Sequence, residues 1–339
     1  PISDGDFDAL LFIRGGTFHG SFVNNGTANF EVNWAQGESR YNGSSDYQGT
    51  YRVRNEAVHR LGFFDADGIL PNIRASLEGI SLFEVLQATA YLEYADVVTA
   101  AGGIDPEDDS VLSLASGGTS AATLVIENDS TLHARGNFTM DAASTLMITG
   151  ESTAGPGGST DGRNLLVDGV STLAGTIDVS ATSDGVTENA RFVGASTLSG
   201  SLTQSSTSYV SFGDTLDLLA GGQWSLTETA TGLVEGDFTV AGLLNLEGTS
   251  ADGLQVDGST TVSSGGQIQL LGSRTMSVGG DFTLETGGTV MLEKGTGMTI
   301  GGDYFGDGTL VIEASDSAAS TFAVTGSFTS SGSTRIEAG

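Results

Sequence analysis

Residues 278–284 read Val-Gly-Gly-Asp-Phe-Thr-Leu, and four other segments of the chain repeat this pattern around one glycine. The five glycines follow one another at steps of 22, 22, 22 and 24 residues. A fixed period of this length is typical of a solenoid, in which each repeat stacks on the next. The aligned glycines are Gly236, Gly258, Gly280, Gly302 and Gly326.

Three short runs of alternating apolar and polar residues make up each repeat, and glycine-containing turns separate them. In the repeat that starts at Gly280 the runs are residues 281–284, 289–293 and 298–300. Such alternation predicts β-strands. Each strand must pair with the same strand one repeat away, at about 4.8 Å. Residues 109–339 are therefore predicted to form an all-β, right-handed, three-sided parallel β-helix of about ten coils.

Stacking of the repeats would place equivalent residues in columns along the solenoid. The residue two places after the glycine is usually aromatic and is predicted to point inward, whereas the next residue is often threonine and is predicted to point outward. The turn glycines are expected to adopt positive φ. The predicted core stack consists of Phe138, Phe238, Phe282, Tyr304 and Phe328.

The N-terminal region lacks the 22-residue period and holds six of the eleven arginines. Strands are expected at residues 9–13, 28–32 and 50–53, whereas residues 73–98 fit either a helix or two strands. The acidic residues 105–109 mark the expected junction with the β-helix. Because the first coil of a solenoid exposes a strand edge, residues 1–108 are predicted to form a β-rich capping and assembly domain.

The charge of the chain bounds its partners. The 339 residues carry a formal net charge of -30 and no cysteine. Such a polyanion repels nucleic acid and anionic membranes, so neither is an expected partner. No apolar run approaches the roughly 20 residues of a membrane span, and disulfides and zinc-thiolate sites are excluded. The chain starts at Pro1, as after removal of an export leader, although an excised fragment would look the same.

The glycine-punctuated repeats, with Gly-Asp-Phe-Thr at residues 280–283 and Gly-Gly-Thr-Val-Met-Leu at 287–292, resemble secreted bacterial β-helix proteins. Autotransporter passengers and filamentous-haemagglutinin-like adhesins are of this kind. The resemblance covers about two thirds of the chain and is architectural. It implies a place outside the cell or on its surface, and a role in adhesion or fibre formation. It carries no functional residues over.

Catalysis is not expected. A polysaccharide lyase or glycosidase needs convergent basic residues or paired carboxylates. The three histidines, His19, His59 and His133, show no metal-ligand spacing. The basic residues of the β-helix are scattered over different coils: Arg135, Arg163, Arg191, Arg274, Lys294 and Arg335.

Acidic residues recur directly after the repeat glycine. Asn137, Asp214, Asp237, Asp281 and Asp303 are assigned to this position, with Ser259 and Ser327 interrupting the series. Carboxylates stacked in neighbouring coils repel, and a bound cation such as calcium would relieve the repulsion. Asp237, Asp281 and Asp303 are therefore candidate calcium ligands. Aspartate beside a turn glycine is also ordinary turn chemistry, so both interpretations stay open.

The last residues form a candidate assembly edge, Thr334, Arg335, Ile336 and Glu337. An uncovered parallel strand edge above an apolar core favours association, and a head-to-tail contact that does not close builds a fibre. A chain that continues beyond residue 339 would cover this edge itself. The first hypothesis is thus a non-catalytic extracellular protein that polymerises end to end. The alternatives are a monomeric adhesin or glycan-binding module and, third, a polysaccharide lyase or hydrolase.

Overall fold

The computed structural model describes residues 110–116, 121–127, 130–149, 151–152, 163–183, 187–250, 252–293, 295–314 and 319–338, and before residue 110 the strands β1–β12. The chain divides into two compact units, residues 1–193 and 194–339. In both units three strands follow one another and then the series begins again. We refer to the sheets that these strands form as the first, second and third sheet of each unit.

In residues 1–193 the structure describes seven strands in each of these sheets. The first sheet has β1 (Leu11–Ile13), β4 (Phe30–Asn33), β7 (Thr50–Arg54), β10 (Leu82–Leu86), β13 (Ser110–Ala115), β16 (Asn137–Met140) and β20 (Ser171–Leu173). The second has β2 (Gly16–His19), β5 (Glu38–Asn42), β8 (Val58–Leu61), β11 (Thr89–Leu92), β14 (Thr123–Ile126), β17 (Thr145–Ile148) and β21 (Thr176–Val179). The third has β3 (Phe22–Asn24), β6 (Ser44–Tyr47), β9 (Ser76–Ile80), β12 (Val97–Ala100), β15 (Thr131–Ala134), β19 (Leu165–Val167) and β23 (Ala190–Phe192). A separate pair joins β18 (Glu151–Ser152) to β22 (Thr182–Ser183).

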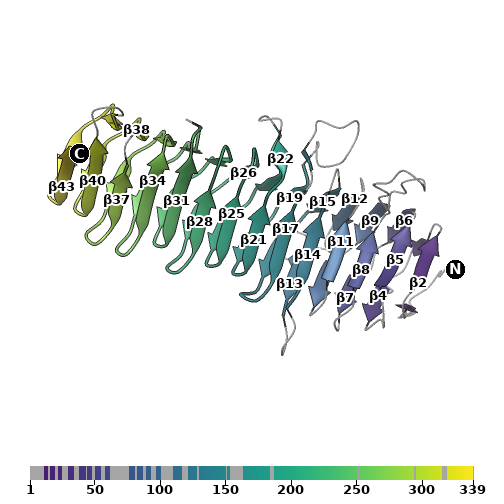
Figure 1. Ribbon diagram of the computed structural model, residues 1–339. Helices are drawn as coiled ribbons and strands as arrows, with labels where there is room; N and C mark the ends of the chain where they lie inside the picture. The colour runs from purple at the N-terminus through teal and green to yellow at the C-terminus, as the bar shows by residue number, and fades with distance from the viewer. Residues whose placement is uncertain are drawn as a thin grey trace. The chain divides into compact units, whose positions relative to one another are not determined.

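Residues 194–339 repeat the arrangement, and Figure 1 shows their second-sheet strands side by side. The first sheet has β24 (Ser196–Leu198), β27 (Leu216–Leu218), β30 (Phe238–Val240), β33 (Thr260–Val262), β36 (Phe282–Leu284), β39 (Tyr304–Gly306) and β42 (Phe328–Ser330). The second has β25 (Ser201–Gln204), β28 (Gln223–Leu226), β31 (Leu243–Gly248), β34 (Gln267–Gly272), β37 (Thr289–Leu292), β40 (Thr309–Ala314) and β43 (Ser333–Ala338). The third has β26 (Tyr209–Phe212), β29 (Thr231–Val234), β32 (Leu254–Val256), β35 (Thr275–Val278), β38 (Gly297–Ile300) and β41 (Thr321–Val324).

This architecture is a parallel β-solenoid with three sheets and about 22 residues per coil. The strand pairs are parallel, and each joins a strand to its equivalent one coil away, as β36 joins β39. The sequence prediction of three stacked strands per repeat is therefore confirmed. The right-handed sense of the coils stays a prediction. Among the described residues, no helix is long and apolar enough to span a membrane.

The predicted capping domain is not seen in the described part of residues 1–108. The strands there pair in parallel from coil to coil, as β4 with β7 and β7 with β10. The three expected strands are confirmed as β1, β4 and β7. Residues 73–98, left open between a helix and two strands, contain β9, β10, β11 and the start of β12. The junction at residues 105–109 lies outside the described residues. An assembly role for residues 1–108 stays a prediction.

The predicted aromatic column is confirmed in residues 194–339, with one interruption. Phe238, Thr260, Phe282, Tyr304 and Phe328 are register partners in successive first-sheet strands. The rings of Phe282 and Tyr304 stack at 5.9 Å, and those of Tyr304 and Phe328 at 4.6 Å. Thr260 separates Phe238 from the others. The stacked rings of Phe282 and Tyr304 bury apolar surface in the core of this unit.

An equivalent column runs through residues 1–193. Phe83 pairs with Leu112 and Leu112 with Phe138, and all three side chains are fully buried. The next coil places Ser171 opposite Phe138. Phe138 is the member of the predicted core stack that lies in this unit, and it faces the core as expected.

The outward residue of the first-sheet strands is usually threonine, as predicted. Thr239, Thr261 and Thr283 are register partners, and each is partly exposed. Phe305 follows them in the same column and is 44% exposed. The inward and outward alternation of each strand thus decides which residues reach the core.

The prediction of positive φ is confirmed for some turn glycines but not for the repeat glycines. The described glycines with positive φ stand at other corners, as Gly221, Gly265 and Gly287 do. A Cβ built on Gly258 would lie 2.5 Å from the carbonyl oxygen of Gly236 in the preceding coil. Close approach of two coils at the corner therefore requires glycine at this position, and a left-handed turn is not the reason.

A second glycine column, before the second-sheet strands, has the same cause. It contains Gly222, Gly242, Gly266, Gly288, Gly308 and Gly332. A Cβ on Gly242 would lie 2.2 Å from the Gly222 oxygen, and a Cβ on Gly266 would lie 2.0 Å from the Val240 oxygen. In the coils that carry both glycines, two corners are therefore packed backbone against backbone.

A buried tryptophan packs in the core of residues 194–339. Trp224 contacts Phe212 and Phe238 edge to face, at 5.4 and 5.9 Å. Its Nε1 donates to Gln204 Oε1 at 2.7 Å, and the Gln204 amide donates to the Thr231 carbonyl at 2.8 Å. Both polar groups of this buried pair are thereby satisfied. Gly232 lies beside the ring, where a Cβ would come within 2.8 Å of it.

Burial raises the pKa of Tyr304 to about 12. Its neutral hydroxyl therefore favours folding below the pKa of a free tyrosine, about 10, and this contribution is lost as pH rises through 12. We expect Tyr304→Phe to lose less stability than the wild type between pH 10 and 12. Melting temperatures of the two proteins measured across this range test the effect. Parallel curves would contradict it.

Candidate functional site

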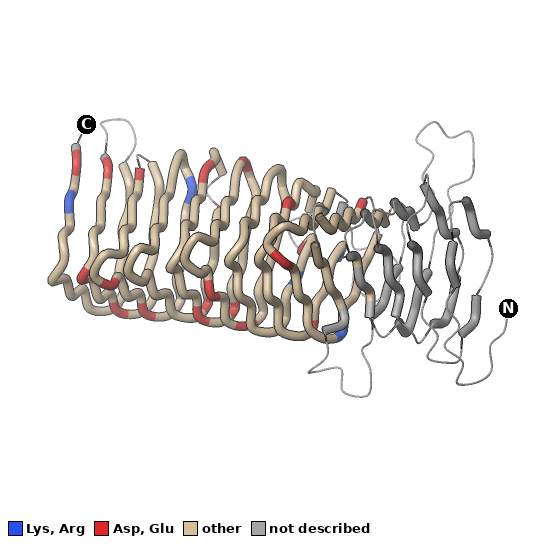
Figure 2. The backbone as a smooth tube through the Cα atoms, turned by 90° about the horizontal axis from the view of Figure 1, so that it is seen from below, with Lys and Arg blue, Asp and Glu red and all other residues tan. Residues whose placement is uncertain are grey.

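The candidate calcium ligands lie at one corner of residues 194–339, where the third-sheet strands lead into the first-sheet strands. Asp237, Ser259, Asp281, Asp303 and Ser327 occupy equivalent positions in five successive coils. Asp281 and Asp303 are in neighbouring coils, whereas Ser259 separates Asp237 from Asp281. Figure 2 shows that most acidic residues of this unit lie in its turns.

A hydrogen-bond ladder connects these side chains along the corner. Oδ1 of Asp237 accepts the backbone N–H of Ser259 at 2.8 Å, and Oγ of Ser259 accepts the N–H of Asp281 at 3.2 Å. Oδ1 of Asp281 accepts the N–H of Asp303 at 2.8 Å, and Oδ1 of Asp303 that of Ser327 at 2.7 Å. Each side chain thus ties its own coil to the following one.

The same type of hydrogen bond between coils occurs in residues 1–193, where Oδ1 of Asn137 accepts the N–H of Val170 at 2.8 Å. An amide and a hydroxyl can fill the position, so the ladder needs an acceptor oxygen and not a charge. Asp214, assigned to this column from the sequence, is misplaced by one residue. Leu216 pairs with Phe238, which aligns Asp214 with Gly236 and Thr215 with Asp237.

Asp303→Asn should leave the ladder intact, because the amide oxygen keeps the acceptor and repulsion with Asp281 is removed. We expect a change in the free energy of unfolding within about 0.5 kcal/mol. Asp303→Ala removes the acceptor of the Ser327 N–H and should cost about 1 kcal/mol. Urea denaturation of both variants measures the difference, and equal losses would mean that the bond contributes nothing.

Calcium at this column stays a prediction. No group of three or more His, Cys, Asp or Glu that could hold a metal is found in the part of the chain that the structure describes. Specific calcium binding would raise the wild-type melting temperature beyond the effect of sodium chloride at equal ionic strength, and Asp303→Asn would lose that increment. A wild-type melting temperature that chelation leaves unchanged would exclude the site.

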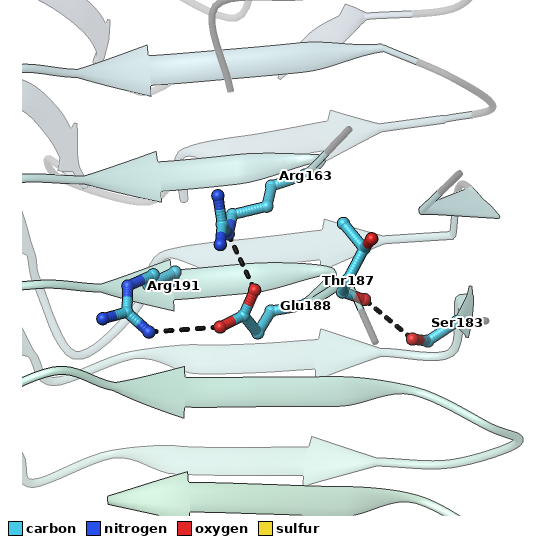
Figure 3. A network of polar contacts seen from close by, with 5 residues as sticks. All are labelled: Arg163, Ser183, Thr187, Glu188 and Arg191. Atoms are coloured by element: carbon cyan, nitrogen blue, oxygen red, sulfur yellow. Dashed lines mark hydrogen bonds and ion pairs between the residues drawn. The ribbon is translucent and has the colours of Figure 1, made fainter. Parts of the chain in front are cut away.

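A second polar cluster, not predicted from the sequence, surrounds Glu188 at the end of residues 1–193. The Glu188 carboxylate is nearly buried and bridges two arginines (Figure 3). Its Oε2 accepts from Arg163 Nε at 2.8 Å, and its Oε1 accepts from Arg191 at 3.1 Å. A buried carboxylate is stable only when it is paired, and here two cations supply the pairing.

Two hydrogen-bonded asparagines lie beside this cluster. Asn189 Nδ2 donates to Asn164 Oδ1 at 3.3 Å, and Asn164 Nδ2 donates to the Ser130 carbonyl at 3.1 Å. Next to Glu188 in the chain, the Thr187 carbonyl accepts a hydrogen bond from the Ser183 hydroxyl at 2.7 Å (Figure 3). The basic residues were expected to be scattered, yet Arg163 and Arg191 converge. Their pairing joins successive coils and has the form of a structural bridge.

His133 is nearly buried on the third sheet of the same unit. Its Nε2 lies 2.8 Å from Asp168 Oδ2. Its Nδ1 has no hydrogen-bond partner among the described residues. This pair is separate from the Glu188 bridge in the hydrogen bonds that the structure shows. The side chains of His19 and His59 lie outside the described residues.

The predicted assembly edge forms the last second-sheet strand, β43. Arg335 and Glu337 pair with each other at 2.9 Å on its exposed side. Ile336 is 71% exposed, and Phe328 in the same coil is 51% exposed although it stacks on Tyr304. Apolar groups of this coil are therefore open to solvent in the chain of residues 1–339.

Comparison of the chain with protein-family models, with curated proteins and with solved structures found no match. The likeness to secreted β-helix proteins therefore remains one of architecture.

Proposed function

We propose that this chain is a non-catalytic extracellular structural protein whose coils assemble end to end into a filament or surface layer. The observation that carries the proposal is the stacking of equivalent coils, in which each described strand pairs in parallel with its equivalent one coil away. Phe328 is 51% exposed, whereas Tyr304, its equivalent one coil earlier, is 1% exposed. Ile336 is 71% exposed, whereas Leu292, two coils earlier in the same column, is fully buried.

When residues 1–339 are prepared as one chain, the strand edge of the last described coil is available for the same stacking. Within the described residues, β41, β42 and β43 each pair on one side, with β38, β39 and β40. Unpaired backbone N–H and C=O groups along a parallel edge accept another strand of the same kind. Because each coil is built to stack on an equivalent coil, a further coil from a second copy fits this surface.

Electrostatics favour contact at this end over contact at the corners. The net charge of -30 opposes any approach of two copies. In the last coil the described charged residues are Arg335 and Glu337, and these pair with each other. The Asp237, Asp281 and Asp303 ladder lies along a corner instead, where two copies side by side would bring carboxylates together. End-to-end contact thus meets less repulsion than lateral contact at this corner.

The experiment is negative-stain electron microscopy and sedimentation velocity of the chain 1–339 over a range of concentrations. We expect fibres whose length grows with concentration. Ile336→Glu or Phe328→Ser should shift the population to single particles, because each places a polar group in the apolar contact. Phe305→Ser is the matched control. Phe305 is 44% exposed on the outer face of the first sheet and not at the end.

Two results would overturn the proposal. Single particles at every concentration would exclude end-to-end assembly by this chain. An equal loss of fibres in Phe305→Ser and Phe328→Ser would show nonspecific hydrophobic association and no specific end contact. Single particles that bind glycans would point to the adhesin hypothesis, and uronide release from pectin or alginate would point to an enzyme.

A further inference from the structure

We draw no further inference here: the strongest candidate, the row of carboxylates at the corner between the third and first sheets of residues 194–339 (Glu235, Asp237, Asp257, Asp281 and Asp303), is an acidic cluster whose ladder oxygens accept backbone N–H groups, and no second observation in the described residues points to a ligand there.

Discussion

Gly258→Ala will lower the free energy of unfolding by about 3 kcal/mol or more. The added Cβ would lie 2.5 Å from the Gly236 oxygen, 2.6 Å from the Gly236 carbonyl carbon and 2.7 Å from Asp237 Oδ1. Two of these atoms are backbone of the coil beneath, so relief of the clash requires the two coils to separate at this corner. Overpacking against atoms that cannot move aside typically costs about 1–3 kcal/mol, and occasionally more.

Gly297→Ala is the control for this substitution. A Cβ at Gly297 would meet Thr275 Cγ2 at 3.3 Å, with no backbone atom within 4 Å, and Gly297 does not have positive φ. We expect this variant to be within about 1 kcal/mol of the wild type, or slightly more stable, because alanine restricts the unfolded chain. Urea denaturation of the three proteins measures both effects. Equal stability of Gly258→Ala and the wild type would refute the backbone packing at the corner.

Arg274→Met will lower the free energy of unfolding by about 3 kcal/mol, which is the second large effect. Arg274 is fully buried, and its guanidinium donates to the carbonyls of Ala230 and, at 3.3 Å, of Glu228. These acceptors stand two coils earlier. Burial lowers the pKa of Arg274, and the charge of Asp252 opposes this shift. Removal of the guanidinium leaves the buried Ala230 carbonyl without this donor, and a buried unsatisfied group costs about 1–3 kcal/mol.

The reach of Arg274 follows from an insertion in the intervening coil. Seven residues lie between Leu246 and Leu254, whereas five lie between their register partners Leu226 and Gly232. At an equivalent corner the Arg274 carbonyl accepts the N–H of Gly297 from the next coil, at 3.0 Å. At Ala230 the guanidinium supplies the donor instead. The buried arginine thus replaces the backbone donor at the corner where the intervening coil is longer.

Arg335→Met is the matched control for Arg274→Met. Arg335 is exposed, and its ion pair with Glu337 is of the surface kind, which contributes from zero to about 1 kcal/mol. Thermal and urea denaturation of both variants, below the concentration at which fibres form, give the comparison. A similar small loss in both would mean that the carbonyls at the Arg274 corner find other donors.

Much of the solenoid could be predicted from local patterns. The alternation in residues 281–284 and the glycine at each corner are properties of a few consecutive residues, and both recur at a nearly constant spacing. The core stack follows from them, since the side-chain direction in a strand alternates strictly. The coils before residue 109 escaped prediction because their spacing is irregular: the register partners Phe30, Tyr51 and Phe83 are 21 and 32 residues apart, although β7 and β10 pair like the later strands.

The sites were harder to predict because they depend on register and not on spacing. Asp214 follows a glycine, as Asp237 does, yet the pairing of Leu216 with Phe238 shifts it by one position. Glu188 is 25 residues from Arg163 and three from Arg191. The number of corner residues between Arg163 and Glu188 differs from that in other coils. Corner insertions change the sequence distance between such residues but leave the strands stacked, so the contact persists without a sequence signal.

The residue pattern alone is enough to predict the parallel stacking of short strands, three to a coil, and the inward and outward faces of those strands. These features depend on neighbouring residues, because alternation and close corner packing act within a few positions along the chain. The folded chain is needed to show that the corner carboxylates accept backbone N–H groups, that Arg274 reaches across a longer coil and that Glu188 joins two arginines. Those contacts join different coils, and their distances are set by stacking at the strand spacing, which the number of intervening residues does not reveal.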